Sequence, residues 1–110
     1  MDVRQYIESE IKNNDVVLFM KGMADLPMCG FSAKVVKILK SLSVKFKDID
    51  VLKSEEIRQE IKDYSDWPTI PQLYVKGEFV GGCDIVSEMY TSNELVSLFE
   101  EKGIIAKSSI

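Results

Sequence analysis

An uninterrupted run of five apolar residues, Val16 to Met20, predicts a strand that is buried on both faces. The neighbour expected for such a strand is another parallel strand. Upstream of the run, Val3, Ile7 and Ile11 recur at helical spacing. They predict a short amphipathic helix that ends around Asn13 and Asn14 and packs on the sheet.

A second helix is predicted from about Gly30 to Leu42. Its apolar residues recur at helical spacing, and lysines occupy the opposite side. In residues 45–50, which follow, Phe46 and Ile49 suggest a second strand that ends in a charged turn. A strand, helix and strand of this length imply a right-handed parallel crossover, with the first helix covering the other face of the sheet.

The next elements alternate helix and hairpin. Ser54 can cap a third helix that carries acidic residues in its first turn. Residues 73–75 and 79–80 are apolar and flank a Lys-Gly-Glu turn, which predicts an antiparallel hairpin. Asp84 can cap the helix that follows, and Asn93 opens a last helix closed by Gly103.

This order of elements predicts an α/β fold in which a four-stranded mixed sheet lies between helical layers. At 110 residues, 45% of them hydrophobic, the chain suits one domain over residues 1–110 with a frayed tail at 106–110. A net charge of −4 and the lack of histidine argue against a nucleic-acid surface and a His-based metal site.

The cysteine content bears on the compartment. Two cysteines, without a signal-like apolar segment, point to a reducing compartment, and no stretch has transmembrane length. We expect a cytoplasmic protein of bacterial type, although a processed organelle form would look the same.

Cys29 is the candidate reactive residue, because the turn around Pro27 and Gly30 places it at a helix start. A free cysteine has a pKa of about 8.5, and a helix N-terminus or a nearby cation lowers it. Lys21 is the candidate cation, and the hydroxyl and amide of Ser32 could donate to the sulfur. Since Ser32 occupies the fourth position of the motif, no resolving thiol lies next to Cys29. The alternative is a buried cysteine that packs as a small hydrophobe.

Three further features could bind an anionic, extended ligand. Arg58 and Lys62 lie four residues apart on one side of the third helix, although a solvated basic face would look the same. The amides that follow Gly82 form a second helix start that accepts anions. The prolines before the hairpin leave strand-edge backbone free to pair with a peptide.

Three motifs carry a family resemblance. Residues 29–32 (Cys-Gly-Phe-Ser), 67–72 (Trp-Pro-Thr-Ile-Pro-Gln) and 81–84 (Gly-Gly-Cys-Asp) resemble the monothiol CGFS-type glutaredoxins in register, and the likeness extends from Val3 to Glu101. The resemblance implies a thioredoxin-like fold in which Pro71 is the cis-proline and Cys29 faces glutathione.

The family's glutathione-binding positions can be carried over one by one. The resemblance assigns them to Lys21, Arg58, Thr69, Ile70, Gly82, Cys83 and Asp84. Lys62 and Trp67 are further candidates, the latter as a wall of the site. The charges agree, because Arg58 and Lys21 could bind the glycine carboxylate, the amides near Gly82 the other carboxylate, and Asp84 the amine. The segment from Met23 to Leu26 departs from the family's usual loop.

Function remains open between three classes. The resemblance favours a carrier in which Cys29 is the metal ligand: a [2Fe–2S] cluster needs four ligands, which two chains and two glutathiones supply in a homodimer that is monomeric as the apo form. It also implies apo iron–sulfur acceptor proteins and a possible BolA-type partner. The alternatives are a glutathione-dependent oxidoreductase acting through Cys29, for which the resemblance implies poor activity, and an interaction scaffold with an inert thiol.

Cys83 has two interpretations. It could pack as a small apolar residue behind the Gly-Gly turn, or it could form a disulfide with Cys29 under oxidation.

Overall fold

The computed structural model describes residues 2–106 and contains the predicted four-stranded mixed sheet. The central strand β1 (Val16–Met20) pairs in parallel with β4 (Lys47–Asp50) on one side and antiparallel with β5 (Gln72–Val75) on the other. Strand β6 (Glu78–Gly81) completes the sheet beside β5, in the order β4-β1-β5-β6. The hairpin and the parallel crossover are therefore confirmed.

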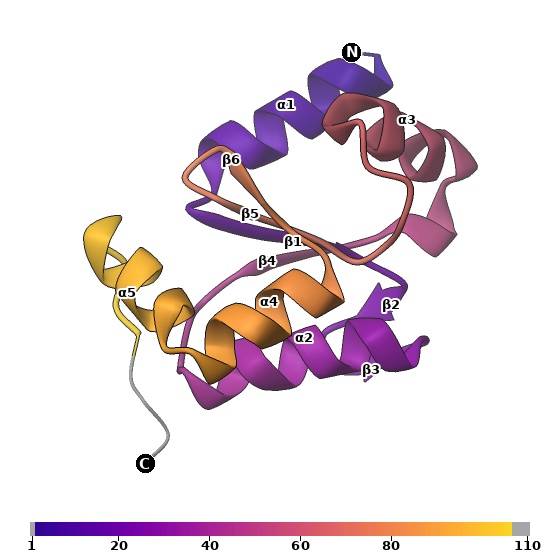
Figure 1. Ribbon diagram of the computed structural model, residues 1–110. Helices are drawn as coiled ribbons and strands as arrows, with labels where there is room; N and C mark the ends of the chain where they lie inside the picture. The colour runs from indigo at the N-terminus through magenta and orange to yellow at the C-terminus, as the bar shows by residue number, and fades with distance from the viewer. Residues whose placement is uncertain (1, 107–110) are drawn as a thin grey trace.

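Helices cover both faces of this sheet, as Figure 1 shows. Helices α1 and α3 lie together on one face and α2 and α4 on the other, while α5 follows α4 near one end. The helices are α1 (Val3–Asn13), α2 (Gly30–Ser41), α3 (Glu55–Ser65), α4 (Cys83–Thr91), α5 (Glu94–Glu101) and a short 3₁₀ turn, η1 (Val51–Lys53). The architecture is the thioredoxin-like fold.

Strand β1 is buried on both faces because its side chains alternate between two cores. Val16, Leu18 and Met20 pack with the residues of α2, α4 and α5. Val17 and Phe19 pack on the side of α1 and α3. The five-residue apolar run therefore serves two hydrophobic layers, as predicted.

The helix starts agree with the sequence in most cases. The Ile57 N–H donates to the Ser54 hydroxyl at 3.2 Å, which confirms Ser54 as the cap of α3. Asn93 opens α5 as predicted, and Gly103 follows that helix in a left-handed conformation. The prediction that Asp84 caps α4 is wrong. Helix α4 begins two residues earlier than that cap implies, so Gly82 is the N-cap and Asp84 lies exposed in the first turn.

The segment after β1 forms a two-stranded ribbon that no sequence pattern indicated. Its strands are β2 (Gly22–Met23) and β3 (Leu26–Pro27), which pair antiparallel. Two carboxylates from the end of β4 hold it: Asp50 Oδ1 accepts from Gly22 N–H at 2.9 Å, and Asp48 Oδ2 accepts from Ala24 N–H at 2.8 Å. The charged end of β4 thus fixes the loop that leads to Cys29.

Two predicted boundaries differ from the structure. Strand β4 begins at Lys47, because residues 44–46 lie outside the ladder with β1, although Phe46 still packs against the core. Within the predicted frayed tail, Ala106 is half-buried against the core, and residues 107–110 lie outside the described part.

Among residues 2–106, no helix has the length and apolar character needed to cross a membrane.

Candidate functional site

Cys29 lies at the start of α2, as the sequence predicts. It is the N-cap residue, with extended backbone at φ −155° and ψ 137°, and its carbonyl accepts the Ala33 N–H at 2.9 Å. The thiol is half-buried, while the neighbouring Phe31 side chain is 63% exposed. The first-turn amides of α2 therefore surround a sulfur that solvent can still reach.

The pKa of Cys29 is lowered below its ordinary value. The backbone N–H of Ser32 is the largest influence, partial burial opposes it, and then the N–H of Phe31, the charge of Lys21 and the Ser32 hydroxyl add to the lowering. Every group that the sequence suggested for activating the thiol thus contributes. The backbone N–H groups at the helix start lower the pKa of Cys29 more than the charge of Lys21 does.

Ser32 links the two sides of this thiol environment. Its side chain is fully buried, and its hydroxyl oxygen accepts the Lys21 backbone N–H at 3.1 Å. The serine that replaces a resolving cysteine therefore ties the residue after β1 to the first turn of α2. This contact holds Lys21 near Cys29.

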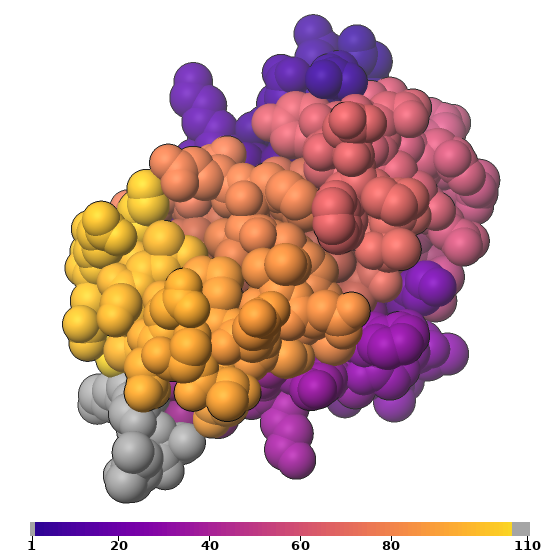
Figure 2. All heavy atoms as spheres, viewed as in Figure 1, coloured from indigo at the N-terminus to yellow at the C-terminus, as the bar shows by residue number. Residues whose placement is uncertain are grey.

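A pocket of about 360 Å³ opens beside this helix start. Figure 2 shows the start of α2, the segment from α3 into the next loop, and α4 meeting on one face of the molecule. The pocket includes every residue assigned to glutathione from the sequence, and Lys62 and Trp67 as well. Its lining is Lys21, Phe31, Arg58, Lys62, Trp67, Pro68, Thr69, Ile70, Pro71, Gly82, Cys83, Asp84 and Ile85.

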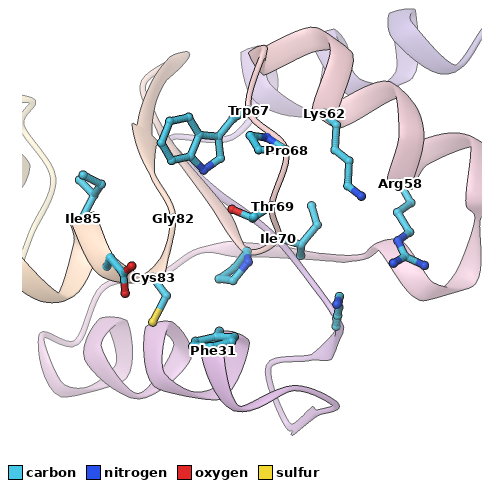
Figure 3. Close-up of a pocket in the computed structure, with 13 residues that line it drawn as sticks. Phe31, Arg58, Lys62, Trp67, Pro68, Thr69, Ile70, Gly82, Cys83 and Ile85 are labelled. Atoms are coloured by element: carbon cyan, nitrogen blue, oxygen red, sulfur yellow. The ribbon is translucent and has the colours of Figure 1, made fainter.

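One end of the pocket is cationic. Arg58 and Lys62 project from α3 toward this end in Figure 3, and Lys21 also lines the pocket. The Arg58 guanidinium makes a long ion pair, 3.9 Å from its Nη1 to Glu55, whose side chain is 70% exposed. Its Nε is buried without a hydrogen-bond partner among the described residues. These donors suit a carboxylate, which binds a guanidinium through charge-assisted hydrogen bonds.

The opposite end is built from the start of α4. Gly82, Cys83 and Asp84 lie there, and the N-cap position of Gly82 leaves the first amides of the helix available to an anion. Gly82 also has little room for a side chain, since a Cβ would come within 3.1 Å of the Pro71 carbonyl. The glycine lets the helix start approach the facing loop.

The loop over residues 67–71 connects the two ends. The Ile70–Pro71 bond is cis, as the family resemblance implies. The buried Gln72 donates from Nε2 to the carbonyls of Trp67, at 3.1 Å, and Thr69, at 3.2 Å. Sequence reasoning missed this role of Gln72, because a single glutamine in an apolar strand gives no periodic signal.

The two cysteines occupy different places relative to the pocket. Cys29 is outside the lining set, although Lys21 and Phe31, which influence its pKa, are part of it. Cys83 lies in the lining, buried, with its sulfur 3.9 Å from the Ser87 hydroxyl. Both thiols are free. In residues 2–106, no three His, Cys, Asp or Glu side chains gather closely enough to hold a metal ion.

A four-stranded mixed sheet between helices, with an activated cysteine at the start of the helix after its central strand, defines a thiol protein of the thioredoxin-like class. The glutaredoxin family model matches residues 16–80. A curated relative, probable monothiol glutaredoxin 2 of Rickettsia felis, is 58% identical over 96 residues, which are 87% of this chain and 92% of the relative. The chain therefore belongs to the glutaredoxin family, and within it to the monothiol glutaredoxins.

Solved structures agree with this assignment. A monomeric truncated mutant of Trypanosoma brucei 1-C-Grx1 is 41% identical, with a TM-score of 0.89 over 98% of both chains. A buckwheat glutaredoxin–glutathione complex is 25% identical, with a TM-score of 0.83 over 94% of this chain and 93% of that one. The second similarity shows that this fold accepts glutathione in a family member.

Proposed function

We propose that the pocket beside Cys29 binds glutathione. The observation that carries this proposal is the distribution of charge around the pocket, with Arg58 and Lys62 at one end and the helix start at Gly82 at the other. Glutathione is an extended peptide with a carboxylate at each end, an amine and a thiol. The buckwheat complex supports the same ligand for this fold.

Each part of glutathione has a chemical partner in this pocket. Arg58 and Lys21 bind the glycine carboxylate, and the amides that follow Gly82 bind the other carboxylate. Asp84, which is exposed in the first turn of α4, pairs with the amine. The backbone at Thr69 and Ile70 pairs with the central peptide group, as an exposed strand edge does. The glutathione sulfur is then directed toward Cys29.

The second part of the proposal is that a [2Fe–2S] cluster is the cargo. The donor chemistry fits, because Cys29 is a half-buried cysteine with a lowered pKa and thiolates are the usual ligands of such clusters. One chain offers one such ligand, so two Cys29 thiolates and two glutathione sulfurs complete the set of four. The loaded form is a symmetric homodimer and the apo form a monomer.

These features support a role in iron–sulfur cluster assembly and transfer. Ligands that are partly external and exchangeable suit delivery to apo iron–sulfur acceptor proteins, and a BolA-type protein could replace one subunit. Both cysteines are free, which is consistent with work in a reducing compartment such as the cytoplasm.

A second function, reduction of glutathione mixed disulfides, is favoured by the lowered pKa of Cys29. In that reaction the Cys29 thiolate attacks the glutathionyl sulfur, the S–S bond breaks, and the substrate leaves as a thiolate that takes up a proton. Free glutathione then attacks the Cys29–glutathione disulfide and releases oxidised glutathione. Because position 32 is serine, no second thiol in the motif competes for this step.

The test of the binding site is a calorimetric titration of the apo protein with reduced glutathione. Arg58→Gln should weaken binding by about 10- to 150-fold, the range for a lost charge-assisted hydrogen bond of about 1.5–3 kcal/mol. Arg4→Gln is the matched control. Arg4 pairs with Glu60 and lies over the Tyr64 ring outside the pocket lining, so its loss changes net charge equally.

Equal glutathione affinities in wild type and Arg58→Gln would mean that Arg58 does not bind the ligand and belongs only to a solvated basic face of α3. A similar loss in Arg4→Gln would show that net charge, and not the pocket, governs binding.

A further inference from the structure

Gln72 is one of two buried polar side chains among the described residues, and all of its hydrogen-bonding atoms have partners. Its Nε2 donates to the Trp67 carbonyl at 3.1 Å and to the Thr69 carbonyl at 3.2 Å. Its Oε1 accepts from the Tyr74 hydroxyl at 3.1 Å. A fully satisfied buried polar network specifies one conformation, because any other arrangement leaves a buried group unpaired.

The Tyr74 hydroxyl completes the hydrogen bonding of the Gln72 amide. Its ring is fixed in the core, with ring centroids 5.7 Å from Phe19 and 5.4 Å from Phe79. Burial raises the pKa of Tyr74 to about 12, so its hydroxyl keeps its proton well above neutral pH. The two loop carbonyls can only accept hydrogen bonds, so the Gln72 nitrogen faces the loop and its oxygen is left to accept from the Tyr74 hydroxyl.

The loop carbonyls that Gln72 binds belong to the wall of the pocket. Trp67, Thr69 and Ile70 all line it, as Figure 3 shows. In a trans peptide unit the C=O and the N–H point in opposite directions. The Thr69 carbonyl is turned toward the buried Gln72, so the N–H of Ile70 in the same unit is turned away from Gln72.

We infer that Gln72, whose oxygen pairs with Tyr74, is a positioning residue for the peptide ligand: by holding two loop carbonyls inward it presents the Ile70 N–H to the ligand's central peptide group. This inference rests on the proposed function, because it assigns a determinant of glutathione affinity. Gln72 itself stays beneath the loop and outside the pocket lining.

The loop over residues 67–71 packs against the start of α4, so the position of the loop affects the ligand site. A Cβ on Gly82 would come within 3.1 Å of the Pro71 carbonyl and 3.6 Å of Trp67 Nε1. The loop and the start of α4 therefore pack closely against each other where both line the pocket. A loop released from Gln72 would shift against the same helix start that binds the ligand's carboxylate.

The experiment is a titration of ¹⁵N-labelled apo protein with reduced glutathione, followed by amide resonances and calorimetry. Gln72→Met should lower affinity by about 10- to 100-fold, because it leaves both carbonyls and the Tyr74 hydroxyl unpaired. Tyr74→Phe, which keeps the ring, should lower it by about 2- to 10-fold. In wild type the Ile70 amide resonance should move on saturation, and this shift should shrink in both variants.

Two controls separate positioning from general stability. Leu95→Val removes a methylene group from a fully buried residue of α5 away from the pocket, and should lower the melting temperature without changing glutathione affinity. The pH dependence of Cys29 alkylation should stay at the wild-type midpoint in Tyr74→Phe, because neither network residue is among the influences on that thiol.

The outcomes are distinguishable. Wild-type affinity, within twofold, in folded Tyr74→Phe and Gln72→Met would overturn the role of Gln72 and leave the proposed function in place, as would an affinity loss in Leu95→Val of the same size. If Gln72→Met does not fold, unchanged affinity in Tyr74→Phe alone overturns the inference. A wild-type chain that does not bind glutathione refutes the proposed function and this inference together.

Discussion

At the scale of single residues, the chemistry of Cys29 comes mainly from the backbone. The Ser32 N–H lowers its pKa more than the charge of Lys21 does. The sequence allowed both to be anticipated, because a cysteine between a turn and a patterned helix falls at the helix start. It could not rank them, since the ranking depends on the distances from the sulfur to each group.

The ranking leads to a prediction for Lys21→Gln. The pKa of Cys29 should rise only part of the way toward its ordinary value, because the amides of Ser32 and Phe31 remain. The measurement is the rate of iodoacetamide alkylation as a function of pH. The rate follows the thiolate fraction, so its midpoint should move upward.

Arg58→Gln is the control for this experiment, because Arg58 lines the pocket but is not among the influences on Cys29. Its alkylation midpoint should match that of wild type. An unchanged midpoint in Lys21→Gln would show that the helix start alone activates the thiol.

At the scale of elements, the ribbon of β2 and β3 could not be predicted from the pattern of apolar and polar residues. Strands of two residues have no periodicity, and the acidic residues at 48 and 50 resemble an ordinary solvated turn. In the structure they accept hydrogen bonds from the ribbon's backbone. Gly22 adapts to this with φ +87°, where a Cβ would lie 2.6 Å from the Leu26 carbonyl. Such long-range contacts cannot be derived from local spacing.

Asp50 provides the test of that interpretation. Its Oδ1 accepts from both Gly22 N–H and Leu52 N–H at 2.9 Å, so Asp50→Ala leaves two amides without their partner. We expect a loss of about 1–3 kcal/mol in the free energy of unfolding and faster hydrogen exchange at both amides.

Asp50→Asn keeps one oxygen at the same place and should retain most of the stability. Equal loss in the alanine and asparagine variants would mean that the charge of Asp50, and not its acceptor geometry, holds the ribbon.

At the scale of the whole molecule, the predicted order of elements was confirmed, because the segments that form the core have the clearest periodic pattern of apolar residues. Val16 to Met20 identified the central strand, and the family motifs at residues 67–72 and 81–84 identified the pocket walls. The Asp84 cap was wrong, because helix boundaries are decided by one or two residues of backbone geometry. The network of Gln72 was missed, because it depends on tertiary contacts of a single side chain.

The buried Tyr74 hydroxyl also affects the stability of the whole fold at alkaline pH. Its pKa is raised to about 12 from an ordinary value of about 10, so between these values the unfolded chain has lost a proton that the folded chain retains. Stability should therefore fall as pH rises from 10 to 12. In Tyr74→Phe this part of the fall should be absent in chemical denaturation at each pH, whereas parallel curves for the two proteins would contradict the raised pKa.

In the proposed function each chain contributes one thiolate, from Cys29, and one glutathione to a shared cluster. The most direct measurement is the native mass of protein purified without oxygen in the presence of glutathione. We predict a species with two chains, two glutathiones and one [2Fe–2S] cluster. It should be lost in Cys29→Ser and on removal of glutathione, and retained in Cys83→Ser. A cluster-loaded dimer that survives complete removal of glutathione, or that Cys83→Ser abolishes, would contradict the account.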